Sequence, residues 1–188
     1  SSQIEAIANE AIKHEITVIS MSNNRKLMNN IDENGGVFLS GMMPETQIDK
    51  IVSYALSRGK KSFAVMAPNN KYGITVSSLF KKLVKDRNGI FITSEIYSTN
   101  GKGIEDAAYR TINAFTVPSN MAEGGGNKLK EDFTVSNDDK TFAEVILIPD
   151  AGKNLSKIVR LLDKENINER PYQIIGTNQW DDTSTIND

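Results

Sequence analysis

The sequence contains no cysteine and only one histidine in its 188 residues. The absence of cysteine excludes disulfide bonds, thiolate nucleophiles and zinc–thiolate sites together. It fits an oxidising compartment, where a free thiol is a liability, although cytosolic proteins can lack cysteine too. The single histidine, His14, stands between Lys13 and Glu15 on the polar side of the first predicted helix. We therefore predict no catalytic role for it.

Long apolar runs and a strong net charge are also missing. No stretch reaches the roughly 18 apolar residues that a membrane-spanning helix needs. Ser1 leads almost directly into an amphipathic helical pattern, so we expect no signal peptide within these residues. The 22 basic and 24 acidic residues give a net charge of −2 and form no basic stripe. Nucleic acid is therefore not an expected partner.

What the sequence does contain is a repeating α/β pattern, which is clearest between Val37 and Gly73. Residues 37–39 are apolar, and the next apolar residues recur at the spacing of one helix face: Ile48, Ile51, Val52, Ala55 and Leu56. Pro44 suits the first turn of that helix, and Gly59 suits the left-handed position that ends it. Residues 62–67 are apolar with little alternation, as in a strand covered on both faces. The stretch therefore predicts a strand–helix–strand unit with parallel strands.

The same alternation continues along the chain. Strands are predicted at 16–20, 37–39, 62–67, 90–97, 143–149 and 172–176. Helices are predicted from apolar stripes that begin at Ile4, Ile48, Val76, Ile104 and Leu155, the fourth of which extends to Phe115. The polar segment 117–140 breaks the rhythm and is interpreted as a mobile surface insertion. We predict an α/β fold with a Rossmann-like parallel sheet and helices on both faces.

Ligands of such sheets bind beyond the carboxyl ends of the strands. The loops to inspect are therefore 20–24, 40–43, 68–72, 97–99, 149–151 and 177–181. Gly101-x-Gly103 with Asp106 is an incomplete dinucleotide fingerprint, because the third glycine is missing. No acid-rich motif or phosphate loop accompanies the strand-end aspartates, so we predict neither a metal nor a cofactor.

Five segments carry a resemblance to a known family: ITVISMSNN (16–24), VFLSGMMPETQIDKIVSYALSRGKKSFAVMAPNNKYG (37–73), GIFITSEIY (89–97), AEVILIPDAGKNLSKIVRLL (143–162) and YQIIGTNQW (172–180). In this order and spacing they resemble the middle of a type I periplasmic solute-binding protein, and the branched-chain amino-acid branch is the most similar. The resemblance covers most of the chain except the 117–140 insertion. The strand followed by PNNKYG and a helix is its strongest part.

Proteins of this family have two Rossmann-like lobes joined by a hinge, with the ligand enclosed between them. The resemblance implies that residues 1–43 are the incomplete end of the first lobe. Residues 44–176 would be the second lobe with its 117–140 insertion, and 177–188 a hinge or tail segment. The chain would then be a fragment, and missing first-lobe strands would leave an apolar edge that favours self-association.

The resemblance also implies ligand-binding residues. Ser22 and Asn24 fall in the small polar loop that holds the ligand carboxylate in the family. Tyr72 matches the aromatic residue that closes over the ligand, and Asp150 lies at or next to another second-lobe contact. Asn178 stands where amino-acid binders often place an acidic residue for the ligand ammonium. Because an amide cannot neutralise an ammonium, this difference argues against a simple amino acid as ligand.

Each of these residues has a structural alternative. Ser22 and Asn24 suit helix caps, Tyr72 suits packing at the sheet edge, and Asp150 and Asn178 suit turns.

The residues after Asn178 add two further candidates. Asp181 or Asp182 would be the substitute acidic partner for a ligand ammonium. Trp180, the only tryptophan, either stacks on a ligand or lines the lobe, and we expect the second.

The resemblance implies a non-enzymatic function. The chain would belong to a periplasmic or extracellular receptor, with a lipid anchor as an option in the full-length parent. Such a receptor binds a small polar ligand, such as an amino acid or a derivative, for an ABC-type permease. The alternative is a regulatory domain similar to the activators of penicillin-binding proteins in peptidoglycan synthesis, which VFLSGMMP and YALSRG resemble about as well. A Mg²⁺-dependent α/β enzyme that uses Asp150, Asp181 and Asp182 is the least favoured hypothesis.

Overall fold

The computed structural model describes residues 2–21, 37–41, 43–117, 139–166 and 169–181. It divides into two compact units, Ser1–Gln47 and Ile48–Asp188.

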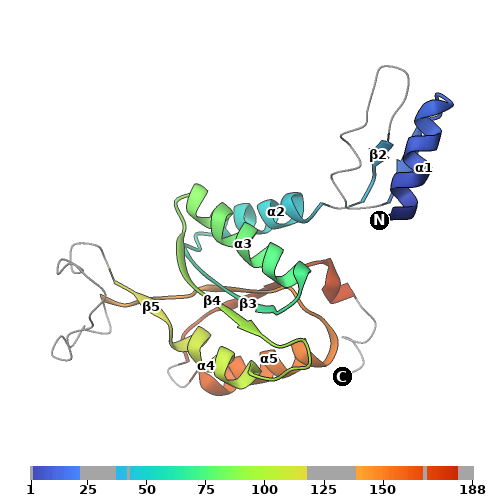
Figure 1. Ribbon diagram of the computed structural model, residues 1–188. Helices are drawn as coiled ribbons and strands as arrows, with labels where there is room; N and C mark the ends of the chain where they lie inside the picture. The colour runs from blue at the N-terminus through green and yellow to red at the C-terminus, as the bar shows by residue number, and fades with distance from the viewer. Residues whose placement is uncertain (1, 22–36, 42, 118–138, 167–168, 182–188) are drawn as a thin grey trace, which may run out of the picture. The chain divides into compact units, whose positions relative to one another are not determined.

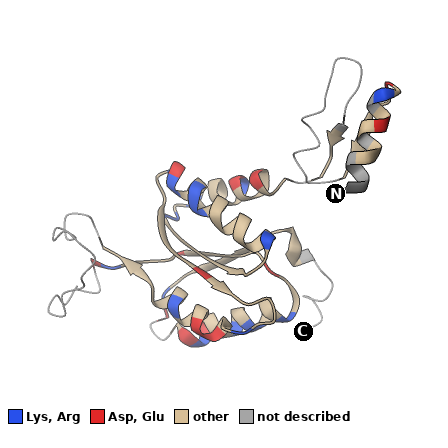
Figure 2. Cartoon of the chain, in the orientation of Figure 1, with Lys and Arg blue, Asp and Glu red and all other residues tan. Residues whose placement is uncertain are grey.

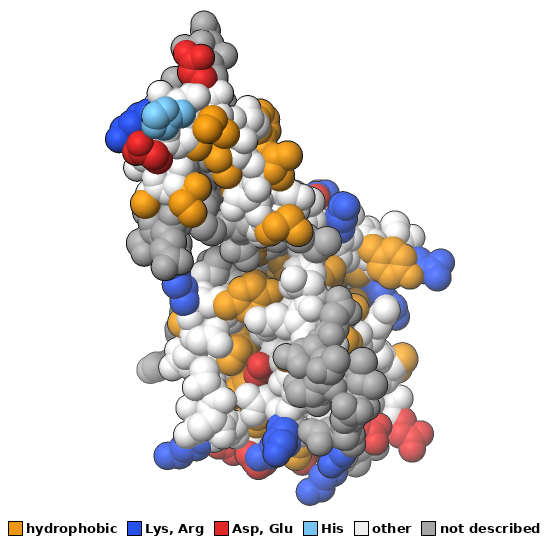
Figure 3. All heavy atoms as spheres, turned by 90° about the vertical axis from the view of Figure 1, so that its right-hand side faces the viewer, with side chains coloured by type: hydrophobic (Ala, Val, Ile, Leu, Met, Phe, Trp, Pro, Cys, Tyr) orange, Lys and Arg blue, Asp and Glu red, His pale blue; other side chains and the backbone are white. Residues whose placement is uncertain are grey.

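The smaller unit contains one helix and two short strands. These are α1 (Ser2–Lys13), β1 (Val18–Ser20) and β2 (Val37–Leu39). The two strands pair in parallel, with Ile19 opposite Phe38, as the sequence predicts for this part of the chain. Ile19 is 73% exposed and Phe38 is 53% exposed, and Figure 3 shows hydrophobic side chains gathered on this unit. One face of the strand pair is therefore apolar and uncovered.

The larger unit alternates strands and helices along the chain. Its elements are α2 (Pro44–Ser57), β3 (Ser62–Pro68), α3 (Lys71–Asp86), β4 (Ile90–Tyr97), α4 (Ile104–Asn113), β5 (Phe115–Thr116), β6 (Thr141–Phe142), β7 (Val145–Ile148), α5 (Gly152–Glu165), β8 (Gln173–Gly176) and a 3₁₀ helix η4 (Asn178–Asp181). Four strands form one sheet in the order β4-β3-β7-β8, and all of its pairings are parallel. Figure 1 shows α2 and α3 on one face of this sheet and α4 and α5 on the other. The predicted α/β fold with helices on both faces is confirmed.

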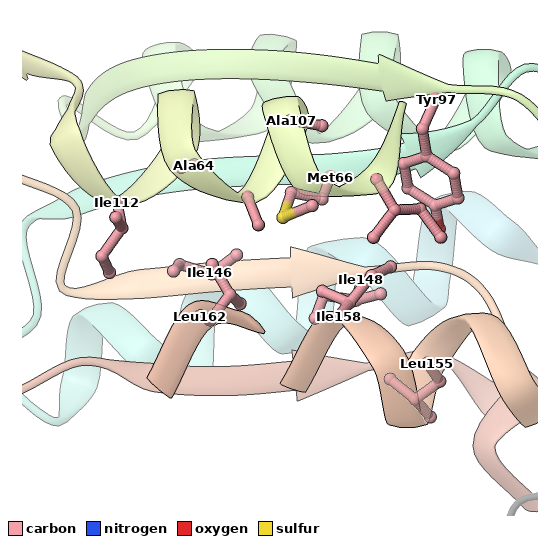
Figure 4. Close-up of a cluster of buried hydrophobic side chains, with 12 residues drawn as sticks. Ala64, Met66, Tyr97, Ala107, Ile112, Ile146, Ile148, Leu155, Ile158 and Leu162 are labelled. Atoms are coloured by element: carbon pink, nitrogen blue, oxygen red, sulfur yellow. The ribbon is translucent and has the colours of Figure 1, made fainter. Parts of the chain in front are cut away.

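The alternation of side chains along β3 explains the two covered faces. Every residue of β3 is buried. Ala64 and Met66 pack in the cluster with α4 and α5, which Figure 4 shows, whereas Phe63, Val65 and Ala67 pack in the cluster with α2 and α3. Each large apolar side chain that is fully buried contributes about 1.5–3 kcal/mol to folding. The continuous apolar run that the sequence shows at 62–67 is thus the centre of the sheet.

The helix ends follow the local sequence. Gly59 has φ +81°, as predicted for the residue that ends α2, and Asn88 takes a left-handed φ of +59° after α3. Asn70 caps the start of α3, because its Oδ1 accepts a hydrogen bond of 2.7 Å from the Gly73 backbone N–H. A Cβ at Gly73 would lie 2.3 Å from the Pro68 carbonyl oxygen, so only glycine allows this close approach of helix and strand.

The structure corrects the prediction around residue 115. The predicted helical stripe reaches Phe115, but α4 ends at Asn113 and Phe115 belongs to β5. β5 pairs with β6 in antiparallel fashion, and the rings of Phe115 and Phe142 are 5.7 Å apart. Cross-strand aromatic packing therefore overrides the helical spacing. Most of the predicted mobile insertion, residues 118–138, lies outside the described residues.

At the amino ends of the strands, Glu144 connects β3 to the start of β7. Its carboxylate accepts hydrogen bonds from the backbone N–H groups of Lys61, at 2.7 Å, and Ser62, at 3.2 Å. Partial burial opposes ionisation, but these hydrogen bonds outweigh it and lower the pKa of Glu144. The sheet is thus tied together at the edge opposite to the one where ligands of α/β sheets bind.

Candidate functional site

The loops after β3, β4, β7 and β8 meet at one edge of the sheet, because the four strands are parallel. This carboxyl edge carries three of the predicted site residues, Tyr72, Asp150 and Asn178. The other two, Ser22 and Asn24, lie outside the described residues. The structure therefore brings part of the predicted site to one edge of the larger unit.

Asp150 follows β7 directly and is held by three hydrogen bonds. Its Oδ2 accepts from the Tyr97 hydroxyl at 2.8 Å and from the Asn154 Nδ2 at 3.1 Å. Its Oδ1 accepts from the Ala151 backbone N–H at 2.9 Å. A carboxylate has about four lone-pair positions for such bonds. Most of the acceptor capacity of Asp150 is therefore satisfied inside the larger unit.

Tyr97, the last residue of β4, is the buried partner in this group. Only 2% of its surface is exposed, and Figure 4 shows it at the tip of the strand beside the core. Burial raises the pKa of the Tyr97 phenol, and the neighbouring charge of Asp150 and the hydrogen bond between them raise it further. Tyr97 therefore remains a proton donor to Asp150 at neutral pH.

Asn154 in the first turn of α5 joins the loops after β4 and β7. Besides Asp150, its Nδ2 contacts the Thr99 carbonyl oxygen at 3.2 Å. A Cβ at Gly101 would lie 3.1 Å from the Asn154 Oδ1, so this glycine gives the side chain room. Neither Tyr97 nor Asn154 is among the site residues predicted from the sequence. In the sequence Tyr97 is only the end of an apolar strand, and an isolated Asn154 carries no pattern.

Tyr72 lies in the first turn of α3 and is partly exposed. Its side chain packs against the core cluster between the sheet and helices α2 and α3. The cap of Asn70 and the close approach of Gly73 to Pro68 fix the turn that presents it. Tyr72 thus packs at the edge of the sheet, as the structural alternative predicts. Part of its side chain is also exposed at the carboxyl edge, where it could contact a ligand.

Thr177 and Asn178 follow β8 at the same edge. Asn178 is exposed and begins η4. Thr177 is 5% exposed, and its buried Oγ1 has no hydrogen-bond partner among the described residues. An unpaired buried hydroxyl costs about 1–3 kcal/mol.

Trp180 lines the larger unit, as predicted from the sequence. Its indole Nε1 donates a 2.9 Å hydrogen bond to the Ile148 carbonyl oxygen, and it packs against the α4–α5 cluster. A Cβ at Gly176 would lie 2.0 Å from the indole, so the ring rests directly on this glycine. Trp180, which is part of η4, therefore covers one end of the core between the sheet and helices α4 and α5.

Within the described ranges, no group of three or more His, Asp or Glu side chains is placed to hold a metal ion. The helices of the described ranges are too short or too polar to cross a membrane.

A hollow of about 400 Å³ is lined by side chains of α5. Its lining side chains are Lys153, Ser156, Lys157, Arg160 and Leu161. Figure 2 shows acidic and basic residues interspersed along α4 and α5. Because none of Tyr72, Asp150 and Asn178 lines this hollow, we place the candidate site at the carboxyl edge instead, where the polar residues converge.

The comparison with curated proteins gives a distant relative. No family model matches the chain. An uncharacterised protein of Rickettsia prowazekii (strain Madrid E) is 27% identical over 175 residues, which are 93% of this chain and 41% of that protein.

Solved structures are similar in shape at low sequence identity. A putative branched-chain amino acid ABC transporter protein from Rhodospirillum rubrum has a TM-score of 0.61 at 12% identity, over 88% of this chain and 39% of its own. An ABC transporter substrate-binding protein from Desulfitobacterium hafniense, in complex with Leu, has a TM-score of 0.58 at 12% identity, over 96% and 45%. A solute-binding protein of an ABC transporter from R. palustris, in complex with benzoate, has a TM-score of 0.55 at 10% identity, over 91% and 39%.

The fold is that of a type I periplasmic binding protein. The resemblance predicted from the sequence is thereby confirmed at the level of the fold. The chain spans 39 to 45% of the length of these type I periplasmic binding proteins and 41% of the Rickettsia relative. A fold hosts many ligands, so the ligand has to be argued from the residues of the site.

Proposed function

We propose that this chain is part of an extracytoplasmic solute-binding protein and that the carboxyl edge of its larger unit binds a small polar ligand. The observation that carries the proposal is the four-stranded parallel sheet of type I periplasmic binding proteins, with polar residues at the edge where such sheets bind ligands. Two proteins of this fold have Leu or benzoate bound. Delivery of the ligand to an ABC permease and a periplasmic or extracellular location are parts of this proposal.

Two side chains of the larger unit suit direct contact. Tyr72 offers a partly exposed ring at the start of α3, which would cover an apolar part of the ligand. Asn178 offers an exposed amide that both donates and accepts hydrogen bonds. Asp150 would act mainly by ordering the loops around the ligand, because its carboxylate is already hydrogen-bonded.

The family resemblance would assign the smaller unit to the first lobe. We retain the assignment of residues 1–43 to a first lobe and 44–176 to a second, with 177–188 as a hinge or tail segment. Ser22 and Asn24 would then contribute donors from the loop after β1. A ligand that contacts both lobes favours the closed state by the difference between its affinities for the closed and open states.

Calorimetry on the full-length parent protein tests this function. Titration with a panel of amino acids, carboxylates and short peptides should give saturable binding to at least one compound. Tyr72→Ala should weaken that binding by about tenfold or more, since loss of a packed aromatic contact costs more than about 1.4 kcal/mol. Tyr54→Ala is the matched control, because Tyr54 is 55% exposed on α2 and stacks with Arg58. Absence of heat for every compound, or equal effects of the two substitutions, would contradict the proposal.

The regulatory alternative, contact with a penicillin-binding protein, stays a prediction. Among the described residues, no surface or contact favours it over solute binding.

A further inference from the structure

Helix α5 carries a row of basic residues on the side that faces away from the core. Its residues Leu155, Ile158 and Leu162 are buried in the cluster between the sheet and helices α4 and α5. The opposite side carries four exposed cations at intervals of four, three and four positions, which align them over about three turns: Lys153, Lys157, Arg160 and Lys164. Asp163 and Glu165 interrupt this row in the sequence, where no basic stripe is apparent, but on the helix they lie roughly a quarter of a turn or more to its sides.

Three of these cations surround one space. The hollow on α5 has a volume of about 400 Å³, and among the described residues its lining side chains are Lys153, Ser156, Lys157, Arg160 and Leu161. Such a volume is within the range of small-ligand sites. This described lining contains no carboxylate, and the Ser156 hydroxyl donates a long bond of 3.4 Å to the Gly152 carbonyl oxygen. The hollow is therefore surrounded by three cations and a weakly held hydroxyl.

The carboxylates of α4 and α5 balance only part of this charge. Glu105 of α4 pairs with Lys157 at 2.5 Å. Asp106 and Asp163 are exposed on the same two helices, but they do not line the hollow. An excess of positive charge therefore remains around it, and such an excess attracts ligands of the opposite sign.

The basic row is unfavourable for the helix itself. Like charges three or four positions apart on a helix repel each other. Lys153 also stands in the first turn of α5, where the positive end of the helix favours acidic residues, and this turn contains none. An anion in the hollow would remove the repulsion, so the arrangement is better suited to a bound anion than to the helix alone.

We propose that the hollow on α5 binds a phosphate group. A phosphate ester has a charge of about −1.5 to −2 at neutral pH and three strong acceptor oxygens. Arg160 can donate two parallel N–H bonds to such a group, and Lys153 and Lys157 supply ammonium donors. None of the carboxyl-edge residues lines this hollow, so the inference goes beyond the proposed function and does not depend on it. Soluble phosphate esters and phospholipid headgroups both present the required group.

Two measurements on the full-length parent separate these sources. Calorimetry with sn-glycerol 1-phosphate should show saturable binding that weakens as NaCl is raised, whereas glycerol should give none. Cosedimentation then compares vesicles of phosphatidylglycerol with vesicles of phosphatidylcholine. Binding of glycerol phosphate without cosedimentation would identify a soluble ester, and binding in both measurements, selective for phosphatidylglycerol, would identify a headgroup.

Two other results would overturn the inference. Absence of binding in both measurements would show that the exposed cations of α5 only face solvent. Cosedimentation without binding of glycerol phosphate would show that the attraction comes from the surface as a whole and not from the hollow.

A pair of double substitutions locates the binding. Lys153→Gln with Arg160→Gln removes two positive charges from the hollow, keeps the pair of Lys157 and Glu105, and should weaken the binding of glycerol phosphate about tenfold or more. Lys82→Gln with Lys85→Gln removes the same charge from exposed positions on α3 and should weaken it about twofold or less. All four side chains are exposed, so both variants should fold, which circular dichroism checks. Equal weakening by the two variants would overturn the inference, because net charge would then explain the binding.

Discussion

Two buried threonines in the larger unit differ in whether their hydroxyls are paired. Thr111 Oγ1 donates to the Ala107 carbonyl oxygen at 2.8 Å, whereas Thr177 Oγ1 has no partner in the part of the chain that the structure describes. Thr177→Val should therefore raise the free energy of unfolding by about 1 kcal/mol, and Thr111→Val should lower it by a similar amount. Urea unfolding of the chain measures both. A loss of stability in Thr177→Val would show that its hydroxyl binds a group such as a buried water.

Tyr97 makes the free energy of unfolding depend on pH in the alkaline range. Its pKa is raised by burial and by Asp150, while a tyrosine in the unfolded chain titrates near about pH 10. The stabilisation is therefore fully present below about pH 10 and is lost as the pH rises further, because only the unfolded state releases the proton. Tyr97→Phe should lose about 1.5–3 kcal/mol at neutral pH. Its unfolding free energy should also fall less steeply than that of the wild type above about pH 10.

Urea unfolding at a series of pH values measures this difference. Tyr172, whose pKa burial also raises, is present in both proteins and does not affect the comparison. Equal slopes above about pH 10 would contradict the account of the Tyr97–Asp150 contact.

The sequence predicts the positions of some residues of the site but not their hydrogen-bond partners. The position of Tyr72 at the carboxyl edge is predictable, because it stands in a recognisable turn between an apolar strand and an amphipathic helix. Asp150 is predictable from its place after a strand. Its partners are not, because the contacts of Tyr97 and Asn154 with Asp150 depend on the order of strands in the sheet, which periodicity does not encode.

At the scale of elements, the packing of η4 at the end of the sheet depends on Gly176. A side chain there would overlap the Trp180 indole, which rests on this residue and donates to Ile148. Gly176→Ala should displace the ring and destabilise the unit by about 1–3 kcal/mol. Since Trp180 is the only tryptophan, its fluorescence reports the displacement as a shift to longer wavelength.

Gly59→Ala is the control for this substitution. A Cβ at Gly59 would meet no atom within 4 Å, although the φ of +81° is strained for alanine. This substitution should lower stability modestly and leave the tryptophan emission unchanged. An unshifted emission in Gly176→Ala would contradict the packing described for Trp180.

The regular elements are predictable from the sequence because their cause is local. Apolar periodicity and residues such as Gly59 and Asn88 fix most helices and strands to within a few residues. The β5–β6 pair and η4 are not predictable in this way. β5 and β6 are two residues long each and form only because distant segments meet, and η4 depends on the packing of Trp180.

At the scale of the whole molecule, the apolar face of the smaller unit favours association. Ile19 and Phe38 lie opposite each other on β1 and β2 and are largely exposed. The chain should therefore self-associate in a concentration-dependent way, and Ile19→Lys with Phe38→Lys should reduce this. Ile74→Lys, at a residue 50% exposed on α3, is the control. Light scattering that shows a monomer at all concentrations would contradict this prediction.

The central claim is that a solute binds at the carboxyl edge of the β4-β3-β7-β8 sheet, and hydrogen exchange on the full-length parent tests it most directly. With a ligand identified by calorimetry, backbone amides in 68–73, 97–102, 149–152 and 176–180 should exchange more slowly when the ligand is bound. Amides at the opposite edge, around Glu144, should change little. Protection confined to that opposite edge, or no protection at the four loops while calorimetry shows binding, would contradict the account.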